Sequence, residues 1–342
     1  MASILRRGER WQVKIRRDGY PPESRTFDRR ADAEAWARGQ EGEMDRGAWR
    51  DRSSADSTTF HALLIRYLKD VVPSKRGAET ESLRIKTLMR DDLARYKLSA
   101  LSPLVLADWR DRRLAVGAAG STVNRELNII SAVINWARKE LMFAVENPVG
   151  GIRRPANNKP RDRRLEEGEE VRLLDALQNH SGEKLRGDGK KYRRGTRNTW
   201  IKPLVMLALE TAMRRGELLA LRWENVDLRS RVARLPETKN GEARAVPLSS
   251  GAVAVLESLP RSLHGRVFPV TADALKRAFE RAVKRAHIEG FHFHDLRHEA
   301  TTRLAERLPN LIELAAVTGH KDLKMLKRYY HPRAEDLARK LG

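Results

Sequence analysis

The segment Thr211-Ala-Met-Arg-Arg-Gly-Glu-Leu218, followed by Leu221-Arg-Trp223, is the stretch from which the rest of the chain can be interpreted. The apolar residues 199–212 predict a helix that ends here, so Arg214 stands near the start of the next helix, three residues before Glu217. Taken alone, an arginine at such a position more commonly forms a surface ion pair than part of an active site. Its interpretation therefore depends on the motifs that come after it along the chain.

A β-hairpin is predicted directly after this segment. Residues 231–236 alternate between apolar and polar side chains as in a short strand, and a second strand begins at residues 244–248. Asn240-Gly241 between them is a strong hairpin signal, because both residues accept positive φ. The turn presents Lys239 at its rim, where a lysine by itself is usually only solvated.

The third motif is His292-Phe-His-Asp-Leu-Arg-His298, which opens a predicted helix. His294 and Arg297 are three residues apart, so both side chains lie on one face of the helix, near the N-terminal end that attracts anions. A zinc site built from His292, His294 and His298 is a weaker interpretation. The chain has no cysteine and no nearby Asp-rich set to complete a tetrahedral site.

Two further motifs come next along the chain. Thr318-Gly319-His320 ends a predicted helix that starts near Leu311, with its glycine as the C-terminal cap. Tyr329-Tyr330-His331 is the last, and Tyr329 lies nine residues after His320. Adjacent tyrosines more commonly pack a terminal helix against a core. A catalytic role for this pair is therefore supported only in combination with the other motifs.

In this order the motifs resemble the boxes of the tyrosine recombinases of the phage-integrase type, over the region after about residue 163. The resemblance implies a set of catalytic residues with two supporting ones: Arg214, Lys239, His294, Arg297, His320 and the nucleophile Tyr329, supported by Glu217 and His298. One departure is Ala212, where many members carry glycine. The family's tyrosine usually precedes a histidine by two positions, which selects Tyr329 by matching to His331 and leaves Tyr330 as the alternative.

These residue types suit the cleavage of a DNA phosphodiester by a side-chain oxygen. Attack adds negative charge to the phosphate, which Arg214 and Arg297 can bind through planar, bidentate contacts. A phenol has an ordinary pKa of about 10, so Tyr329 needs a cationic site or a base, for which His294 is the candidate. Lys239 is the natural acid for the leaving 5′ oxygen. The product is a 3′-phosphotyrosyl DNA, and neither a metal nor another cofactor is expected.

The N-terminal region is predicted to be a module of a small sheet and one helix. Apolar residues alternate with polar ones over residues 11–15, and residues 24–27 form a second strand. Asp28 is expected to cap a helix over residues 29–45 through its carboxylate. Residues 47–58 are polar and predict a linker.

Helical patterns fill residues 59–141, which predicts a bundle of about four helices. Ser102-Pro103 signals the start of one helix and Ser121 the start of another. Residues 147–160 predict a second linker, because prolines interrupt the helical pattern there.

The predicted fold class is α+β and mainly α. A helix is expected at residues 166–177, and a Gly-, Lys- and Arg-rich stretch at residues 181–198 predicts a mobile surface loop. The three predicted domains are an arm-type DNA-binding module, a helical, SAM-like core-binding domain and a mixed α/β catalytic domain of the tyrosine recombinase type, at residues 1–50, 58–148 and 163–342.

The charge balance favours DNA as the partner. Lys and Arg number 68 against 46 Asp and Glu, a formal net charge of +22. A membrane is disfavoured because no apolar run approaches the roughly 20 residues that cross a bilayer and no signal peptide is expected, so a cytoplasmic, DNA-associated location is expected. The residues expected to meet DNA are Lys14, Arg16, Arg17, Arg25, Lys75, Arg76, Lys86, Arg112, Arg113, Asn124 and Arg125.

The expected function is site-specific DNA recombination by the integrase of a phage, prophage or other integrative element. The resemblance implies double-stranded DNA attachment sites, a homotetramer in the synaptic complex, exchange through a Holliday junction, and an excisionase and a DNA-bending host protein as further partners. Two alternatives stay open. One is a Xer-like resolvase of chromosome or plasmid dimers, which usually starts at the helical domain, and the other is a non-catalytic DNA-binding repressor. Type IB topoisomerases share the chemistry, but the three-part layout favours an integrase.

Overall fold

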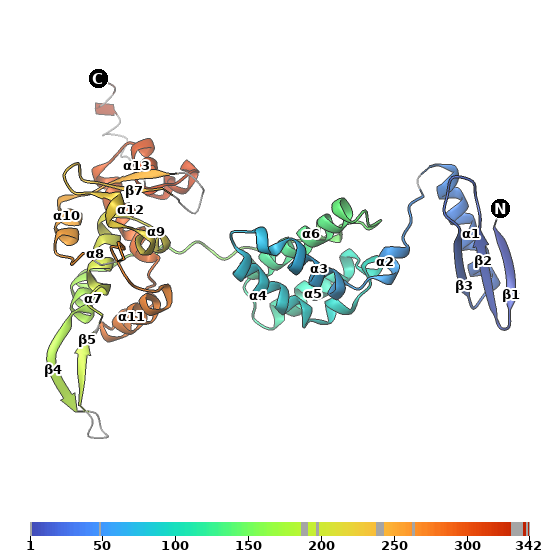
Figure 1. Cartoon of the computed structure of the whole chain (residues 1–342), viewed down its shortest axis with the longest axis horizontal. Coiled ribbons are helices and arrows are strands. Elements are labelled where there is room, and N and C mark those ends of the chain that lie inside the picture. The colour runs from blue at the N-terminus through green and yellow to red at the C-terminus, as the bar shows by residue number, and fades with distance from the viewer. Residues whose placement is uncertain are drawn as a thin grey trace. The chain divides into compact units, whose positions relative to one another are not determined.

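The computed structural model describes residues 2–47, 49–185, 191–195, 198–236, 243–261, 264–329, 338–339 and 341. The chain divides into two compact units, residues 1–159 and 160–342. Helices predominate in the described residues, and the strands form small antiparallel sheets (Figure 1). The α+β, mainly α class expected from the sequence is therefore confirmed.

The first unit begins with a three-stranded antiparallel sheet packed on one helix (Figure 1). The elements are β1 (Ser3–Arg7), β2 (Arg10–Ile15), β3 (Glu23–Phe27) and α1 (Arg30–Asp45), with the strands in the order β1-β2-β3. Val13 and Ile15 of β2 are fully buried and pack in one cluster with Ala33, Ala37 and Met44 of α1. The alternation of apolar residues in β2 thus provides one wall of this small core.

Two details of this module differ from the sequence prediction. β1 adds a third strand, which the sequence hides because four of its five residues are exposed and leave no alternating pattern. Asp28 does not cap α1. The residue at the cap position is Arg29, and the carboxylate of Asp28 instead forms an exposed ion pair with Arg10 at 3.1 Å. The cationic side chain of β2 competes successfully for this carboxylate.

The rest of the first unit is a helical bundle. Its helices are α2 (Ser53–Ser57), α3 (Phe60–Asp70), α4 (Ala78–Met89), α5 (Pro103–Ala115) and α6 (Gly120–Glu140), with 3-10 turns η1 (Val72–Ser74), η2 (Asp92–Arg95), η3 (Leu98–Ala100) and η4 (Pro148–Gly151). Phe60, Leu106 and Trp109 lie at the centre of its core. As predicted, the Ser102 hydroxyl caps α5 by accepting from the backbone N–H of Val105, and Pro103 is the first helical residue.

Two parts of the bundle were not expected. The short helix α2 lies inside the predicted linker, where Ala55 is buried at 1% exposure. In α4 the apolar Leu83 is 61% exposed, and Ile85 is buried instead. The sequence could not predict these two features. Ala55 is a single small apolar residue in a polar stretch, and α4 has apolar residues on two faces, so the buried side depends on the neighbouring helices.

The second unit is organised around the apolar helix α8. Its helices are α7 (Glu169–Leu177), α8 (Ile201–Thr211), α9 (Arg215–Ala220), α10 (Ser250–Glu257), α11 (Ala272–Arg285), α12 (Asp295–Arg307) and α13 (Leu311–Thr318). The strands are β4 (Asn179–Leu185), β5 (Lys191–Gly195), β6 (Val226–Asp227), β7 (Val232–Leu235) and β8 (Arg244–Pro247), and the 3-10 turns are η5 (Trp223–Asn225), η6 (Leu323–Met325) and η7 (Lys327–Tyr329). Because α8 is apolar around most of its circumference, it packs against α7, α9, α10, α11 and α12.

Of the two hairpins in this unit, one was predicted from the sequence and the other was not. β7 and β8 pair as predicted, with Val232 opposite Pro247 and Leu235 opposite Arg244, while the Asn240-Gly241 turn lies outside the described residues. The prediction of a mobile loop over residues 181–198 is wrong where β4 pairs antiparallel with β5. Strands this rich in charge and glycine carry no apolar alternation from which to predict them.

Glu126 of α6 gives the bundle a buried charge. It is 4% exposed and is held by Arg113 of α5 through hydrogen bonds of 2.8 and 3.0 Å. The Arg113→Ala variant is expected to lower the free energy of unfolding by about 3 kcal/mol, because Glu126 would keep its buried charge without a cation. Urea unfolding followed by circular dichroism measures this loss.

The neighbouring Arg112 provides the matched control. It is exposed and forms an ion pair with Asp91 at 3.2 Å. Arg112→Ala should therefore change the free energy of unfolding by at most about 1 kcal/mol. Equal losses in the two variants would contradict the importance given to burial of the Arg113–Glu126 pair.

Candidate active site

Arg214 lies immediately before α9, where the chain leaves α8. Its guanidinium donates to Glu217 Oε1 at 2.8 Å and to the carbonyl oxygen of Gly319 at 2.9 Å. Its backbone N–H donates to the second oxygen of the same carboxylate, also at 2.8 Å. Glu217 thus closes the N-terminus of α9 and fixes the guanidinium. The side chain of Arg214 is 22% exposed, which leaves it accessible to an anion.

Glu217 serves two cations. It is buried at 6% exposure, and Arg244 of β8 donates to its Oε2 at 2.7 Å. Burial by itself would raise the pKa of Glu217, but the charge of Arg244 and the hydrogen bonds from Arg214 outweigh it and hold that pKa below its ordinary value. Arg244 also donates to the carbonyl of Val317. The hairpin strand is thereby joined to both α9 and the end of α13.

Arg297 is the most deeply placed cation of the group, at 6% exposure. It donates to the carbonyl oxygens of Ala212 at 2.5 Å and Thr318 at 2.6 Å. Ala212 ends α8 with a left-handed φ of 50°, a conformation that favours glycine, which gives a physical reason for the glycine that many family members carry here. Burial and the charge of Arg214 lower the pKa of Arg297 to about 9, so the group stays cationic at neutral pH.

His320 comes directly after the left-handed Gly319, which caps α13. Its Nδ1 lies 2.7 Å from Thr318 Oγ1, and the Thr318 hydroxyl donates to the carbonyl of Leu314. The Nδ1 of His320 therefore carries a hydrogen, and Nε2 accepts from Arg297 at 3.4 Å. Burial, with the charges of Arg297 and Arg214, lowers the pKa of His320 to about 4, so this ring is neutral at neutral pH.

The start of α12 places His298 beside the expected nucleophile, and His294 lies beside His298. The rings of His294 and His298 lie 5.4 Å apart between centroids and nearly perpendicular, at 84°. The Nδ1 of His298 forms a hydrogen bond with the hydroxyl group of Tyr329 in η7. Burial raises the pKa of the Tyr329 phenol, with Arg328 and Arg297 acting in the opposite direction, so the phenol is protonated at neutral pH.

The structure thus brings five of the six expected catalytic residues together, through contacts among Arg214, Arg297, His320, Tyr329 and the histidines of α12. The sixth, Lys239, lies outside the described residues, as do Tyr330 and His331. Arg297 and Tyr329 influence each other electrostatically. Both supporting residues, Glu217 and His298, are direct neighbours of a catalytic candidate.

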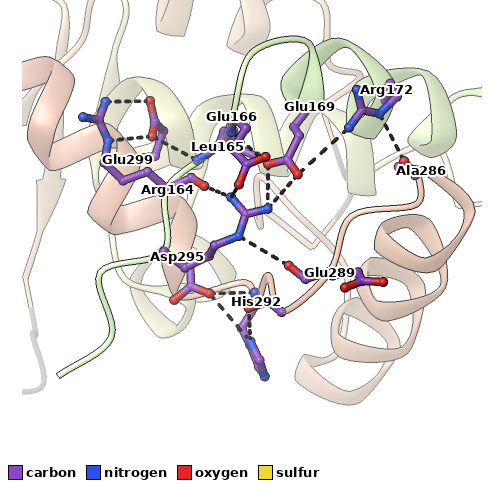
Figure 2. A network of polar contacts seen from close by, with 12 residues as sticks. Arg164, Leu165, Glu166, Glu169, Arg172, Ala286, Glu289, His292, Asp295 and Glu299 are labelled. Carbon is purple, nitrogen blue, oxygen red and sulfur yellow. Dashed lines mark hydrogen bonds and ion pairs between the residues drawn. The ribbon is translucent and has the colours of Figure 1, made fainter. Parts of the chain in front are cut away.

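Two buried carboxylates, each bound to an arginine from the segment before α7, hold the start of α12 in place. The carboxylate of Asp295 is 2% exposed and is held by Arg161 at 2.8 and 3.3 Å, and it accepts from the backbone N–H of His292 at 2.8 Å. Figure 2 shows Asp295 and His292 facing each other at this point. Arg161 belongs to the segment before α7, and its own carbonyl accepts from Arg328 at 3.1 Å. The same segment therefore supports both α12 and the residue next to Tyr329.

Glu299, one turn further along α12, is the second such carboxylate. It accepts from Arg164 at 3.1 Å and from the backbone N–H of Leu165 at 3.3 Å (Figure 2). It also accepts from Arg303 at 2.8 Å. Its pKa, which burial would raise, is held below its ordinary value by Arg164 and Arg303. Two ion pairs thus join the segment at residues 161–165 to the helix that carries His294, Arg297 and His298.

Sequence reasoning missed Arg244, Arg161, Asp295 and Glu299. Asp295 stands inside the third motif, and its place at the first turn of a helix was a signal that it binds a cation or a free N–H. Arg244 is one basic residue in a chain with 68 of them, so its burial could not be read from composition. Partners more than a hundred residues away, as Arg161 is from Asp295, leave no local pattern.

The zinc interpretation finds no support in the described part of the chain, where no three His, Asp or Glu side chains are grouped as metal ligands would be. Nor is any described helix long and apolar enough to cross a membrane.

The DNA-contact candidates of the N-terminal module do not share one face. Arg16, Arg17 and Arg25 are exposed, and Lys14 is half-buried. Lys14 points away from α1, because its neighbours in β2 point into the core, whereas Arg25 stands opposite the buried Val13 and therefore lies on the helix side of the sheet. Arg17 also forms an ion pair at 2.6 Å with Asp45.

In the helical bundle the candidates separate by exposure. Arg76, Lys86, Arg112 and Arg125 are exposed. The other three are half-buried. Lys75 is bound to Tyr67 and Glu81, Arg113 to Glu126, and Asn124 to the carbonyl of Pro155. DNA contacts by these residues stay a prediction, and the exposed four are the better placed.

Comparison with known proteins decides the family. Residues 163–336 match the profile described as the Phage integrase family. The chain is 42% identical to the shufflon-specific DNA recombinase of Escherichia coli over 286 residues, which are 81% of this chain and 70% of that protein. The chain belongs to the phage integrase family. It is a site-specific DNA recombinase of the tyrosine type.

Other members extend the match to the whole chain. A putative integrase/recombinase of Haemophilus influenzae is 33% identical over 99% of this chain and 88% of its own length. Among solved structures, a lambda integrase dimer (residues 75–356) bound to a core site aligns with a TM-score of 0.64 at 21% identity, over 81% of this chain and 97% of that one. A lambda integrase tetramer bound to a Holliday junction aligns with a TM-score of 0.61 at 20% identity, over 93% and 95%. These structures establish the shared fold.

The neutral His320 makes stability depend on pH. Its pKa is about 4 in the folded chain against an ordinary 6.5, so between these pH values the unfolded chain binds more protons. Stability is therefore expected to fall as the pH is lowered through this window, by up to about 3 kcal/mol from this residue. The His320→Asn variant should lose less stability than the wild type over the same window, as measured by urea midpoints. Parallel losses in the two proteins would show that His320 is not held neutral.

Proposed function

We propose that this recombinase cuts and rejoins specific double-stranded DNA sites through a 3′-phosphotyrosyl bond to Tyr329. The observation that carries the proposal is the grouping of Arg214, Arg297 and His320 beside a half-buried tyrosine hydroxyl. A phosphodiester is the anion that such a group suits, since two guanidiniums can bind its non-bridging oxygens. The DNA-bound lambda integrase structures that share this fold support DNA as the partner.

The site keeps a net positive charge for this anion. Three guanidiniums, of Arg214, Arg244 and Arg297, face one carboxylate, that of Glu217. Their other hydrogen-bond partners are uncharged: backbone carbonyl oxygens and the neutral ring of His320. The charge that builds on phosphorus during attack is thus stabilised by donors already in place. His294, at the N-terminal end of α12, adds a further donor toward the phosphate.

We assign the leaving-group proton to Lys239, which lies between β7 and β8 in the sequence. When Tyr329 Oη bonds to phosphorus, the bond from phosphorus to the 5′ oxygen breaks and that oxygen must gain a proton. Arg244, the first residue of β8, contacts Glu217, so the hairpin that carries Lys239 is joined to the arginine cluster.

We propose three domains for this chemistry. Residues 1–50 bind arm-type DNA sites, residues 58–148 bind the core site and residues 163–342 hold the catalytic residues. Four copies assemble on two DNA sites and exchange strands through a Holliday junction, as the lambda tetramer bound to such a junction suggests by analogy. Integration of a phage or other element is the proposed role, with an excisionase and a DNA-bending host protein as partners that set its direction.

A covalent adduct tests the nucleophile. Incubation with a nicked DNA bearing the attachment site is expected to give a protein–DNA adduct that survives SDS, without added metal. Tyr329→Phe should abolish the adduct, because no hydroxyl is left to attack, and Tyr330→Phe should form it. Gel electrophoresis with labelled DNA measures both. If Tyr329→Phe still formed the adduct, or if only Tyr330→Phe lost it, the assignment of Tyr329 as the nucleophile would be wrong.

A sulfur leaving group tests Lys239. Lys239→Ala should slow cleavage of ordinary DNA by about 10²–10⁴-fold, the usual contribution of a general acid. On DNA with a bridging sulfur at the 5′ position, the variant should approach the wild-type rate, because a thiolate leaves without a proton. Single-turnover rates on the two substrates measure this. A variant equally slow on both would show that Lys239 does not protonate the leaving group.

A further inference from the structure

The hydroxyl of Tyr329 is bound to a residue that the sequence assigned only a supporting role. His298 Nδ1 lies within hydrogen-bond distance of Tyr329 Oη, and the two rings are 6.2 Å apart at an angle of 30°. His298 is in the first turns of α12, directly after Arg297. Because successive helical residues point about 100° apart, one turn of α12 supplies both a buried cation and the partner of the phenol.

The direction of this hydrogen bond is set by the protonation of the two groups. The pKa of Tyr329 is raised by burial, so the phenol is protonated and donates. Nδ1 of His298 must then accept, which requires a neutral ring with its hydrogen on Nε2. The Tyr329 hydroxyl therefore donates its hydrogen to the basic lone pair of His298 Nδ1.

Several charged and titratable groups surround His298. From its own helix and the residue before it come His294, Asp295 and Arg297; from η7 come Arg328 and Tyr329; and His320 approaches from the residues after α13. Burial contributes most, followed by the charges of His294 and Arg328, and together they lower the pKa of His298, while Asp295 acts in the opposite direction. The ring is accordingly neutral at neutral pH and can receive a proton.

We propose that His298 is the catalytic base that takes the proton of Tyr329 during DNA cleavage. The inference rests on the proposed role of Tyr329 as nucleophile. It assigns to His298 the role expected from the sequence for His294, which then serves the phosphate oxygens. The observation behind it is that His298 touches the reacting oxygen itself.

The step balances with the groups already named. The proton of Tyr329 Oη moves to His298 Nδ1, Oη bonds to phosphorus, and the bond from phosphorus to the 5′ oxygen breaks. That oxygen takes a proton from Lys239. In rejoining, a 5′ hydroxyl returns its proton to the Lys239 amine and attacks phosphorus, the bond from phosphorus to Oη breaks, and imidazolium His298 returns its proton to Oη.

The pH dependence of cleavage separates this role from a structural one. DNA with a bridging 5′ sulfur is the suitable substrate, because the leaving thiolate removes the titration of Lys239 from the profile. For the wild type, the single-turnover rate should rise with pH up to the pKa of His298, below 6.5, and then stay level. In His298→Gln the amide oxygen can still accept the hydrogen bond but cannot take the proton. Its rate at neutral pH should fall by about 10²-fold or more and keep rising with pH, as hydroxide removes the proton.

Two further variants sharpen the test. His298→Ala should regain activity when imidazole is added, since the small molecule can replace the missing base. His292→Gln changes an exposed ring on the loop before α12 and should keep the wild-type rate and profile. The unfolding temperature and DNA affinity of each variant confirm that the fold and the binding are retained.

The outcomes distinguish this inference from the proposed function. A His298→Gln profile that is level above pH 6.5 like that of the wild type, at whatever rate, would overturn the role of base. The absence of a wild-type adduct, or an adduct in Tyr329→Phe, would overturn the proposed nucleophile instead. Suppose that the pH–rate profile of His298→Gln is level and that the Tyr329 adduct forms normally. Tyr329 would then still be the nucleophile, and a group other than His298 would be the base.

Discussion

Mutual repulsion among three clustered arginines is the constraint on which the catalytic unit depends. Arg214, Arg244 and Arg297 share a small, partly dry region, where burial first and then the charge of Arg214 lower the pKa of Arg244 and of Arg297. One carboxylate, Glu217, holds two of them, and backbone carbonyls hold the rest. Those carbonyls belong to the ends of α8 and α13, where helix dipoles place partial negative charge. Two helix C-termini converging on the cations therefore substitute for additional carboxylates, and their charge is too diffuse to neutralise the site.

This arrangement explains why the helix ends are bent as they are. Ala212 and Gly319 both adopt left-handed backbone conformations, at φ 50° and 71°, and each ends its helix beside an arginine. The turns direct the carbonyls of Ala212 and Thr318 to Arg297, and that of Gly319 to Arg214. A side chain at Gly319 would also meet Arg244, whose Nε would lie 2.9 Å from an added Cβ. The glycine is thus required by the conformation and by the space that Arg244 fills.

The sequence predicted the residues that act through short spacing and missed those that act over long range. Arg214 with Glu217, and His294 with Arg297, are each three residues apart within one motif, and the resemblance of these motifs to those of the family gave them their roles. Matching to family motifs selected Tyr329. Arg244 in a strand, and Arg161 opposite Asp295, depend on how distant segments fold together, and no periodicity encodes that. The same limit applied to the fold. The apolar alternation of β2 predicted a strand, whereas β1 is largely exposed and the sequences of β4 and β5 are mostly polar or charged, without such an alternation.

The segment that enters the catalytic unit has a role beyond connection. Arg161 holds the buried Asp295 with its side chain and accepts a hydrogen bond from Arg328 with its carbonyl. One residue thus braces the start of the helix that carries His298 and the residue adjacent to Tyr329. The separation of His298 and Tyr329 is thus supported from both sides by Arg161, through Asp295 at the start of α12 and through Arg328 in η7. A displacement of Arg161 would disturb the first turn of α12, and with it both Arg297 and His298. The roles proposed for Arg297 in binding the phosphate and for His298 in deprotonating the tyrosine therefore share this support, and Glu217 and the helix ends add a second one on the side of the arginines.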